Sequence, residues 1–177
     1  MKLWNHLFAA IVTAGVTIPV DAADWRWESL GLRYGRSASS FNNLFQQSEA
    51  FVRVDTPWRW DFAQHWRLQT RLDASAGWLG GLDDDGFIGT LGPSVGVKNE
   101  KFPVEIEAGC SPTFMSRVRF GNTDFGMPLQ FTSFLGLSAD MGKRWGAGYR
   151  FQHMSNAGLG SDNPGLNMHM FSVRYRF

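Results

Sequence analysis

Three polar side chains near the C-terminus have the types and the spacing that serine ester chemistry requires. His153 and Ser155 are two positions apart, and Asn167 follows beyond a short loop. A serine hydroxyl becomes a nucleophile when a neighbouring base takes its proton, and the base needs a third group to orient it. The Asn167 amide oxygen can accept a hydrogen bond from the imidazole, although it stabilises an imidazolium less than a carboxylate does. The set predicts His153 as the base, Ser155 as the nucleophile and Asn167 as the orienting residue.

The loop after Ser155 offers donors for the oxyanion that forms when a serine attacks an ester. Residues 156–166 read N-A-G-L-G-S-D-N-P-G-L. Backbone N–H groups near Gly158 and the side-chain amide of Asn163 are the candidates. His169 lies on the same predicted face as Asn167, one strand step lower, and we expect it to be an interface residue and not part of the catalytic set.

Two alternating strands must position these residues. From Trp145 to Phe151 the odd-numbered residues are apolar, and the same period of two runs back from Phe177. This alternation is typical of β-strands, in which successive side chains point to opposite faces. His153, Ser155 and Asn167 fall on the odd-numbered, apolar face. Polar groups on the apolar side of a hairpin are the main clue to function.

Six further alternating segments precede this pair. We expect strands at Trp25–Gly35, Glu49–Trp60, His65–Leu79, Phe87–Val97, Phe102–Phe114 and Gln130–Met141. The connections alternate between long and short, with long loops expected at 36–47, 80–86, 115–129 and after Ser155. Pro93 predicts a bulge in the fourth strand, because proline cannot donate to a strand ladder. This plan is typical of an all-β, eight-stranded antiparallel transmembrane β-barrel of the bacterial outer membrane, with its short turns in the periplasm.

The face opposite the apolar residues carries charges of both signs. Inside a barrel of eight strands such charges should pair into a salt-bridged plug and leave no pore. They are Arg53, Asp55, Arg67, Arg71, Asp73, Glu105, Glu107, Asp140, Arg144, Arg150, Arg174 and Arg176. A soluble exported barrel with its apolar face inward, like a lipocalin, is the rival architecture. The loop alternation, the terminal Phe177 and the Trp-rich strand ends favour the membrane barrel.

The first residues predict export. Lys2, a short apolar run and the small residues around Ala22 predict a signal peptide at residues 1–22, which leaves residues 23–177 as one barrel domain. No later stretch approaches about 18 uninterrupted apolar residues, so no membrane-spanning helix is expected. The formal net charge of +1 implies no nucleic-acid partner. Cys110 is the single cysteine and cannot form a disulfide within the chain.

Strand direction places the polar set near the outer rim. The step from Trp145 to His153 raises the chain by roughly 20 Å at about 3.3 Å per residue and a tilt of about 40°. The apolar band of an outer-membrane barrel is about 25 Å tall. His153 and Ser155 should therefore face lipid at the level of the outer-leaflet head groups, which in Gram-negative cells belong mostly to lipopolysaccharide.

Residues 150–166, R-F-Q-H-M-S-N-A-G-L-G-S-D-N-P-G-L, resemble the lipid A 3-O-deacylase (PagL) family. The resemblance implies an eight-stranded outer-membrane barrel whose lipid-facing Ser-His-Glu site hydrolyses the ester-linked acyl chain at position 3 of lipid A. By position, His153 matches the base and Ser155 the nucleophile. The loop residues around the family's oxyanion hole are matched by Asn156, Gly158 and Asn163. The chain departs from the best-known form at the third member, where Asn167 stands in place of Glu.

The resemblance also implies partners. We expect lipid A or lipopolysaccharide of the outer leaflet as substrate, the barrel assembly machinery as a partner during insertion, and a homodimer as one candidate oligomeric state. No metal and no cofactor are implied. Arg36, Arg117 and Arg119 are candidates to meet lipid A phosphates, with ordinary loop charge as the alternative reading.

Two other functions remain open from the sequence. Outer-membrane phospholipase A has a similar H-x-S-N motif and an Asn as third member, but it is a larger barrel that needs calcium. A small structural or adhesive barrel with a decayed site is the non-enzymatic alternative.

Overall fold

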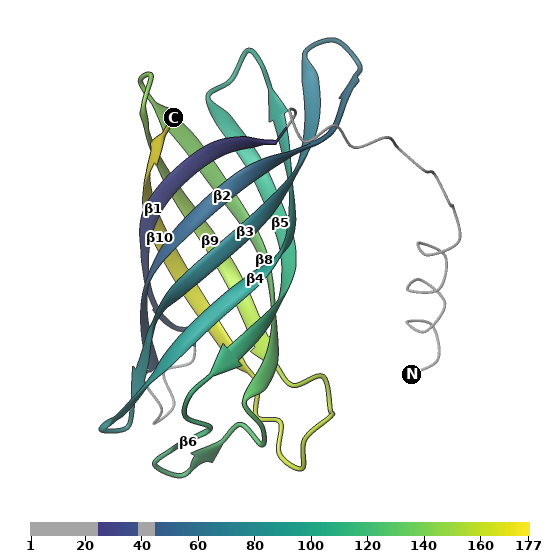
Figure 1. Cartoon of the computed structure of the whole chain (residues 1–177). Coiled ribbons are helices and arrows are strands. Elements are labelled where there is room, and N and C mark those ends of the chain that lie inside the picture. The colour runs from purple at the N-terminus through teal and green to yellow at the C-terminus, as the bar shows by residue number, and fades with distance from the viewer. Residues whose placement is uncertain (1–24, 39–44) are drawn as a thin grey trace.

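The computed structural model describes residues 25–38 and 45–177, so the expected signal peptide, residues 1–22, lies outside the described residues. Eight long strands form one closed antiparallel barrel, which confirms the predicted fold class (Figure 1). They are β1 Arg26–Ser37, β2 Phe45–Phe62, β3 Trp66–Gly81, β4 Asp84–Asn99, β5 Val104–Met115, β8 Leu129–Met141, β9 Trp145–Ser155 and β10 Leu166–Arg176. A small hairpin of β6 Arg119–Phe120 and β7 Thr123–Asp124 lies between β5 and β8. Across residues 25–38 and 45–177, no helix is long and apolar enough to cross a bilayer.

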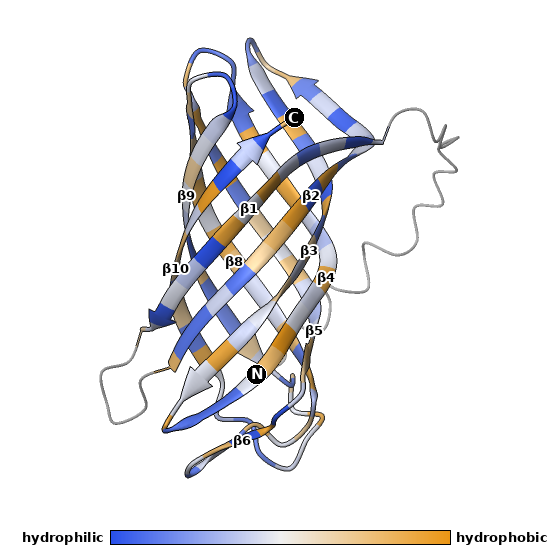
Figure 2. Cartoon of the chain, turned by 60° about the vertical axis from the view of Figure 1, so that its left-hand side comes forward, coloured by the Kyte–Doolittle hydropathy of each residue, from blue (hydrophilic) through white to orange (hydrophobic). Residues whose placement is uncertain are grey.

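Each long strand pairs with its neighbours in chain order, and β1 closes the barrel against β10. The closing register pairs Leu32 with Val173 and Tyr34 with Phe171. All four of these side chains are exposed on the outside of the barrel. Apolar and polar residues alternate along the strands, which appear as orange and blue bands on the ribbons (Figure 2). The apolar face therefore points outward, as expected for a barrel in lipid.

The two ends of the barrel differ. The short connections at residues 63–65, 100–103 and 142–144 lie at one end with the C-terminus, and we call this the turn end (Figure 1). The opposite end, which we call the loop end, carries residues 116–128 with the β6–β7 hairpin and residues 156–165. Short turns at one end and longer loops at the other are the pattern of outer-membrane barrels, in which the short turns are periplasmic.

The long loop expected at residues 80–86 is wrong. β3 and β4 stay paired as far as Gly81 and Asp84, and only Leu82 and Asp83 form the turn. Both turn residues have positive φ values, 56° and 66°. Two left-handed residues give a turn whose twist matches that of the flanking strands. The glycines and acidic residues that indicated a loop thus extend the hairpin.

Two strand irregularities have local causes. In β1, Trp27 and Leu30 both face outward, because a register shift between Trp27 and Ser29 inserts an extra residue. The bulge predicted at Pro93 is wrong. The ladder between β4 and β5 is interrupted from Thr90 to Ser94, yet the same register resumes on both sides. Proline removes a donor from the ladder and adds no residue to the strand.

Most of the predicted interior charges fill the barrel from its middle to the turn end. The prediction is wrong for Arg144, which is exposed at the turn end and donates to the Tyr175 hydroxyl. Arg53 Nε donates to Asp73 Oδ1 at 2.8 Å, and its terminal nitrogens reach both Glu107 oxygens at 2.8 and 2.6 Å. Arg71 pairs with Asp55 at 3.0 Å and with Glu105 at 2.7 Å. These ion pairs join β2, β3 and β5 across the interior. They satisfy charges that would be costly to bury alone.

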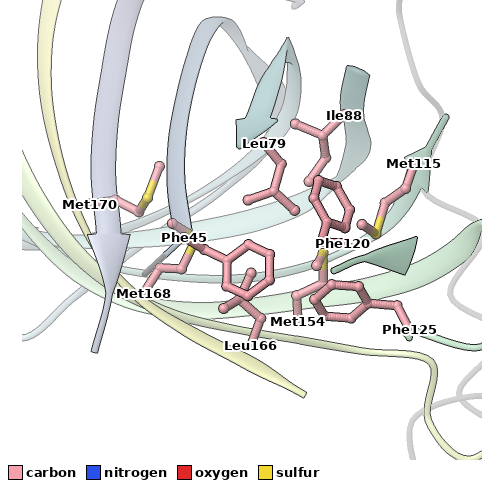
Figure 3. Close-up of a cluster of buried hydrophobic side chains, with 10 residues drawn as sticks. All are labelled: Phe45, Leu79, Ile88, Met115, Phe120, Phe125, Met154, Leu166, Met168 and Met170. Atoms are coloured by element: carbon pink, nitrogen blue, oxygen red, sulfur yellow. The ribbon is translucent and has the colours of Figure 1, made fainter. Parts of the chain in front are cut away.

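The loop end of the interior is apolar, which the predicted salt-bridged plug did not include. Ten buried side chains gather there: Phe45, Leu79, Ile88, Met115, Phe120, Phe125, Met154, Leu166, Met168 and Met170 (Figure 3). Three of the rings pack edge to face, with Phe45 centred 5.5 Å from Phe120 and 5.7 Å from Phe125. The β6–β7 hairpin supplies Phe120 and the residue after it supplies Phe125, so this loop closes the barrel. We call the ten residues the apolar plug.

Candidate active site

The predicted polar set lies on the outside of the barrel at the loop end. His153 and Ser155 are the last residues of β9 on the outward face, and Asn167 is the second residue of β10. His153 and Asn167 are exposed and Ser155 is half-buried, while Met154 and Met168 point inward and are buried. Alternation along the two strands thus separates the polar set from the apolar plug by one residue.

His153 and Asn167 are direct cross-strand partners. Nδ1 of the imidazole lies 2.8 Å from Oδ1 of the Asn167 amide. With the amide in this orientation its oxygen can only accept, so Nδ1 carries the proton and donates it. Nε2 then holds a lone pair and makes no hydrogen bond within the described part of the chain. A neutral imidazole with a free Nε2 is the tautomer that a general base needs.

Gly165 packs against the imidazole. It has a φ of +65°, and a Cβ built on it would lie 3.1 Å from Cε1 of His153 and 3.9 Å from Nε2. A side chain there would meet both a strained backbone and the ring. This contact was not among the predictions made from the sequence. No pattern in the sequence alone signals it.

Asn156 holds the loop that follows Ser155. Its side chain is fully buried, and Nδ2 donates to the carbonyl oxygens of Phe125 at 3.0 Å and Asp162 at 2.6 Å. Its Oδ1 accepts a hydrogen bond from the Gly158 N–H at 2.9 Å. One amide therefore ties residues 156–165 to the loop between β5 and β8. Removing it would leave buried backbone groups without partners.

The two predicted oxyanion donors lie beside this amide. Asn163 Oδ1 accepts the backbone N–H of Asn156 at 3.1 Å, so its NH₂ group is left without a partner among the described residues. The Gly158 N–H is already engaged by Asn156 Oδ1. Ala157 and Gly158 both have positive φ, 56° and 79°, which turns the chain sharply after Ser155. The Asn163 amide is thus the donor that is free, whereas Gly158 would have to exchange its partner.

The rim arginines differ in their partners. Arg117 pairs with Asp84 at 2.7 Å and Arg119 pairs with Asp124 at 2.7 Å. The hydrogen bond from Arg119 holds the pKa of Asp124 below its ordinary value. Arg36, which the structure places in β1 and not in a loop, is exposed and donates from Nε to the Tyr34 hydroxyl at 3.1 Å.

His169 is occupied by a neighbour on the barrel surface. Its Nδ1 lies 2.7 Å from the Tyr149 hydroxyl, and the two rings stack with centroids 6.0 Å apart. Phe151 packs against the same ring at 5.4 Å. His169 thus packs between two aromatic side chains of β9, and its interface role stays a prediction. Within residues 25–38 and 45–177, no three His, Cys, Asp or Glu side chains form a group that could hold a metal ion.

Comparison with known proteins gives the family. The model of the lipid A 3-O-deacylase (PagL) family matches residues 46–176, which is most of the chain. The chain belongs to the PagL family. The lipid A deacylase PagL of Bordetella bronchiseptica is 27% identical over 179 residues, covering 98% of this chain and 97% of that protein. The resemblance noted over residues 150–166 therefore extends along nearly the whole chain.

Solved structures support the fold of this PagL-family chain. The crystal structure of the outer membrane enzyme PagL has a TM-score of 0.69 and 21% identity, covering 81% of this chain and 97% of that one. Neisserial surface protein A is a more distant barrel, with a TM-score of 0.53 and 12% identity over 87% of this chain and 97% of that one. Both likenesses concern the fold alone. Together with the outward apolar face, the family makes the chain an outer-membrane β-barrel.

Proposed function

We propose that the protein is a lipid A 3-O-deacylase that uses Ser155 as its nucleophile and His153 as its base. The observation that carries the proposal is the hydrogen bond of 2.8 Å between His153 Nδ1 and Asn167 Oδ1. His153 lies two residues before Ser155, which faces outward on the same strand. The hydrogen bond supports a base with a free Nε2 directed away from Asn167. Membership of the PagL family supports the substrate. The enzyme is thus a carboxylic ester hydrolase acting on outer-leaflet lipid.

The reaction begins with proton transfer from the Ser155 hydroxyl to His153 Nε2. The serine oxygen attacks the carbonyl carbon of the 3-linked ester, and the carbonyl electrons move to the oxygen. The Asn163 NH₂ group, and the Gly158 N–H once it exchanges its partner, donate to this oxyanion. Collapse of the intermediate breaks the bond to the sugar oxygen, which takes the proton from His153. Lipid A with a free 3-hydroxyl leaves, and the acyl chain stays on Ser155.

Water completes the cycle. His153 removes a proton from a water molecule, and the water oxygen attacks the acyl-enzyme. Collapse of the second intermediate breaks the bond to Ser155 Oγ, which takes the proton from His153, and a free fatty acid leaves. Asn167 keeps the proton on Nδ1 throughout and orients the ring. Because Asn167 is neutral, it stabilises the imidazolium less than a glutamate would, so the chemical step should be slower than with a carboxylate partner.

The test uses the purified protein in detergent micelles with lipid A as substrate. Wild-type protein should release the 3-linked fatty acid, and Ser155→Ala should lower the rate at least about a thousandfold. Ser161→Ala is a matched control from the same loop and should keep the wild-type rate, because within the described residues the Ser161 hydroxyl donates only to the neighbouring Asp162 side chain, at 3.3 Å.

Assaying the same preparations with a glycerophospholipid distinguishes the proposed deacylase from a phospholipase. Release of lysophospholipid by the wild type, without any loss from lipid A, would replace the proposal by a phospholipase. A folded barrel that releases no fatty acid from either lipid would replace it by a structural or adhesive role.

A further inference from the structure

We propose that Arg36 binds the phosphate on carbon 1 of the lipid A sugar whose 3-linked ester is cleaved, and so selects phosphorylated lipid A. This inference rests on the proposed deacylase function and adds a specificity determinant to it. Three features of Arg36 support the inference: its strand pairing beside Asn167, its charge without a carboxylate partner, and its hydrogen bond to the Tyr34 hydroxyl.

Strand register places Arg36 beside the catalytic set. On β1, Ala38 donates its N–H to the Asn167 carbonyl at 2.8 Å, and Arg36 is the direct cross-strand partner of His169. Arg36 therefore lies diagonally from Asn167 on the same outward face. Diagonal neighbours in an antiparallel pair remain within reach of long side chains. The guanidinium can extend along the surface toward the head-group level, as arginines at membrane interfaces do.

The charge of Arg36 has no carboxylate partner among the described residues. Arg117 and Arg119, the two other arginines considered for lipid A phosphates, are neutralised by Asp84 and Asp124. The cost of an arginine on the lipid-facing surface grows with depth below the interface. An anion supplied by lipid would offset this cost for Arg36, which lies one strand step below Asn167.

A polar support fixes the side chain and leaves its binding groups free. The Tyr34 hydroxyl accepts from Arg36 Nε at 3.1 Å and donates to Gln46 Oε1 at 2.8 Å. Both terminal nitrogens of the guanidinium stay without partners in the described part of the chain. Their planar fork fits two oxygens of a phosphate. The Tyr34 hydroxyl thereby holds Arg36 with the fork open.

Substrate chemistry selects the phosphate. Lipid A is a glucosamine disaccharide with phosphates on carbon 1 of one sugar and carbon 4′ of the other. The sugar that carries the 3-linked ester also carries the carbon 1 phosphate, two ring positions away. With the ester at Ser155, the carbon 1 phosphate is held nearer to the site than the carbon 4′ phosphate, because the latter belongs to the second sugar.

The experiment measures equilibrium binding to Ser155→Ala protein in detergent micelles, so that no turnover occurs. The two ligands are lipid A phosphorylated only at carbon 1 and lipid A phosphorylated only at carbon 4′. Adding Arg36→Gln should weaken binding of the carbon 1 isomer about tenfold and leave the carbon 4′ isomer unchanged, because a charged hydrogen-bond pair is lost. Arg36→Lys should weaken binding of the carbon 1 isomer by a smaller factor, since lysine keeps the positive charge but lacks the planar fork of the guanidinium.

Two further variants test whether the effect is specific to Arg36. Arg117→Gln removes an exposed guanidinium that is already paired with Asp84, and it should change neither affinity. Tyr34→Phe removes the hydroxyl that supports Arg36 and should weaken binding of the carbon 1 isomer by a smaller factor than Arg36→Gln does. Heat-dependent mobility on a gel checks that every variant is a folded barrel.

Equal affinities before and after Arg36→Gln would overturn the inference, and a loss confined to the carbon 4′ isomer would overturn the assignment to carbon 1. In protein with Ser155 intact, the same substitution should raise KM for the carbon 1 isomer while kcat stays near the wild-type value. Absence of hydrolysis by the wild type would defeat the deacylase proposal alone, because the binding arms still decide the role of Arg36.

Discussion

The interior of the barrel has two parts with different chemistry. Toward the turn end, Arg53 and Arg71 bind four carboxylates, those of Asp55, Asp73, Glu105 and Glu107, and so join β2, β3 and β5. At the loop end, the apolar plug fills the space with Phe, Met, Leu and Ile side chains (Figure 3). Charged pairs fix which strands meet across the barrel, while the plug fixes the ends of β9 and β10. The difference indicates that only the loop-end part bears on the catalytic geometry.

The polar set sits directly over the plug. Met154 lies between His153 and Ser155 in sequence, and Met168 follows Asn167; both are buried, at 2% and 0% exposure. Because neighbouring residues of a strand point to opposite faces, packing of the two methionines fixes the backbone that carries the outward groups. Changes to the charged part should therefore alter stability alone, and changes under the site should alter stability and rate together.

The largest effect is expected from Glu107→Ala in the charged part. Its carboxylate accepts two hydrogen bonds from Arg53, at 2.8 and 2.6 Å, and its loss leaves a buried arginine undercompensated. The free energy of unfolding should fall by about 3–5 kcal/mol, measured by urea titration in micelles. The exposed Arg67→Ala is the control and should cost about 1 kcal/mol or less. A parallel fall in kcat of folded Glu107→Ala protein would show that the charged part also shapes the site.

Met154→Ala should cost stability and activity together. The cavity left in the plug should lower the free energy of unfolding by about 3 kcal/mol, and the loosened β9 should lower kcat. Ile88→Ala is the matched control, because Ile88 belongs to the same plug at 1% exposure but lies on β4, away from the site. It should lose similar stability and keep its kcat. Equal losses of kcat in both variants would mean that activity follows overall stability.

Asn156→Ala should free the loop after Ser155. The variant loses the hydrogen bonds to Phe125, Asp162 and Gly158, at an expected cost of about 1–3 kcal/mol in stability. Amide hydrogen exchange across residues 157–163 should become faster, and kcat should fall about tenfold because the oxyanion donors are no longer held. Unchanged exchange in this loop would contradict the anchoring role.

The smallest expected effect concerns the third member of the catalytic set. Asn167→Glu should raise kcat about tenfold, since a carboxylate stabilises the imidazolium better than an amide, and Asn167→Ala should lower it. Both rates are measured on lipid A in micelles. A Glu variant no faster than the wild type would indicate that another step, such as product release, limits the rate.

The alternation of apolar and polar residues predicted most of the fold and the outward orientation of the site. A period of two places His153 and Ser155 on one face whatever the rest of the barrel does, so their outward direction followed from β9 alone. The turn at Leu82 was missed because its glycines and aspartates suit a loop as well as a hairpin. Met154, Met168 and Met170 were signals for an apolar interior, since they occupy the inward face of β9 and β10 at that level.

Contacts between distant segments were beyond reach from the sequence. The partners of Arg53 depend on how β2 and β5 face each other across the closed barrel, which no local pattern encodes. The same holds for Asn156, whose buried amide depends on where the loop bearing Phe125 folds back. The sequence also could not distinguish Arg36 from Arg117 and Arg119. Only the structure shows that the latter two pair with Asp84 and Asp124.

The most direct test of the outward-facing esterase site is mass spectrometry of lipid A from a Gram-negative host. One culture expresses the intact protein and a second expresses Ser155→Ala at the same level in the outer membrane. We predict that lipid A from the first culture lacks one acyl chain, located at position 3, and that lipid A from the second matches the empty host. Identical lipid A in all three cultures, with both proteins folded in the membrane, would contradict the deacylase site. A missing chain that persists in Ser155→Ala would place the nucleophile elsewhere.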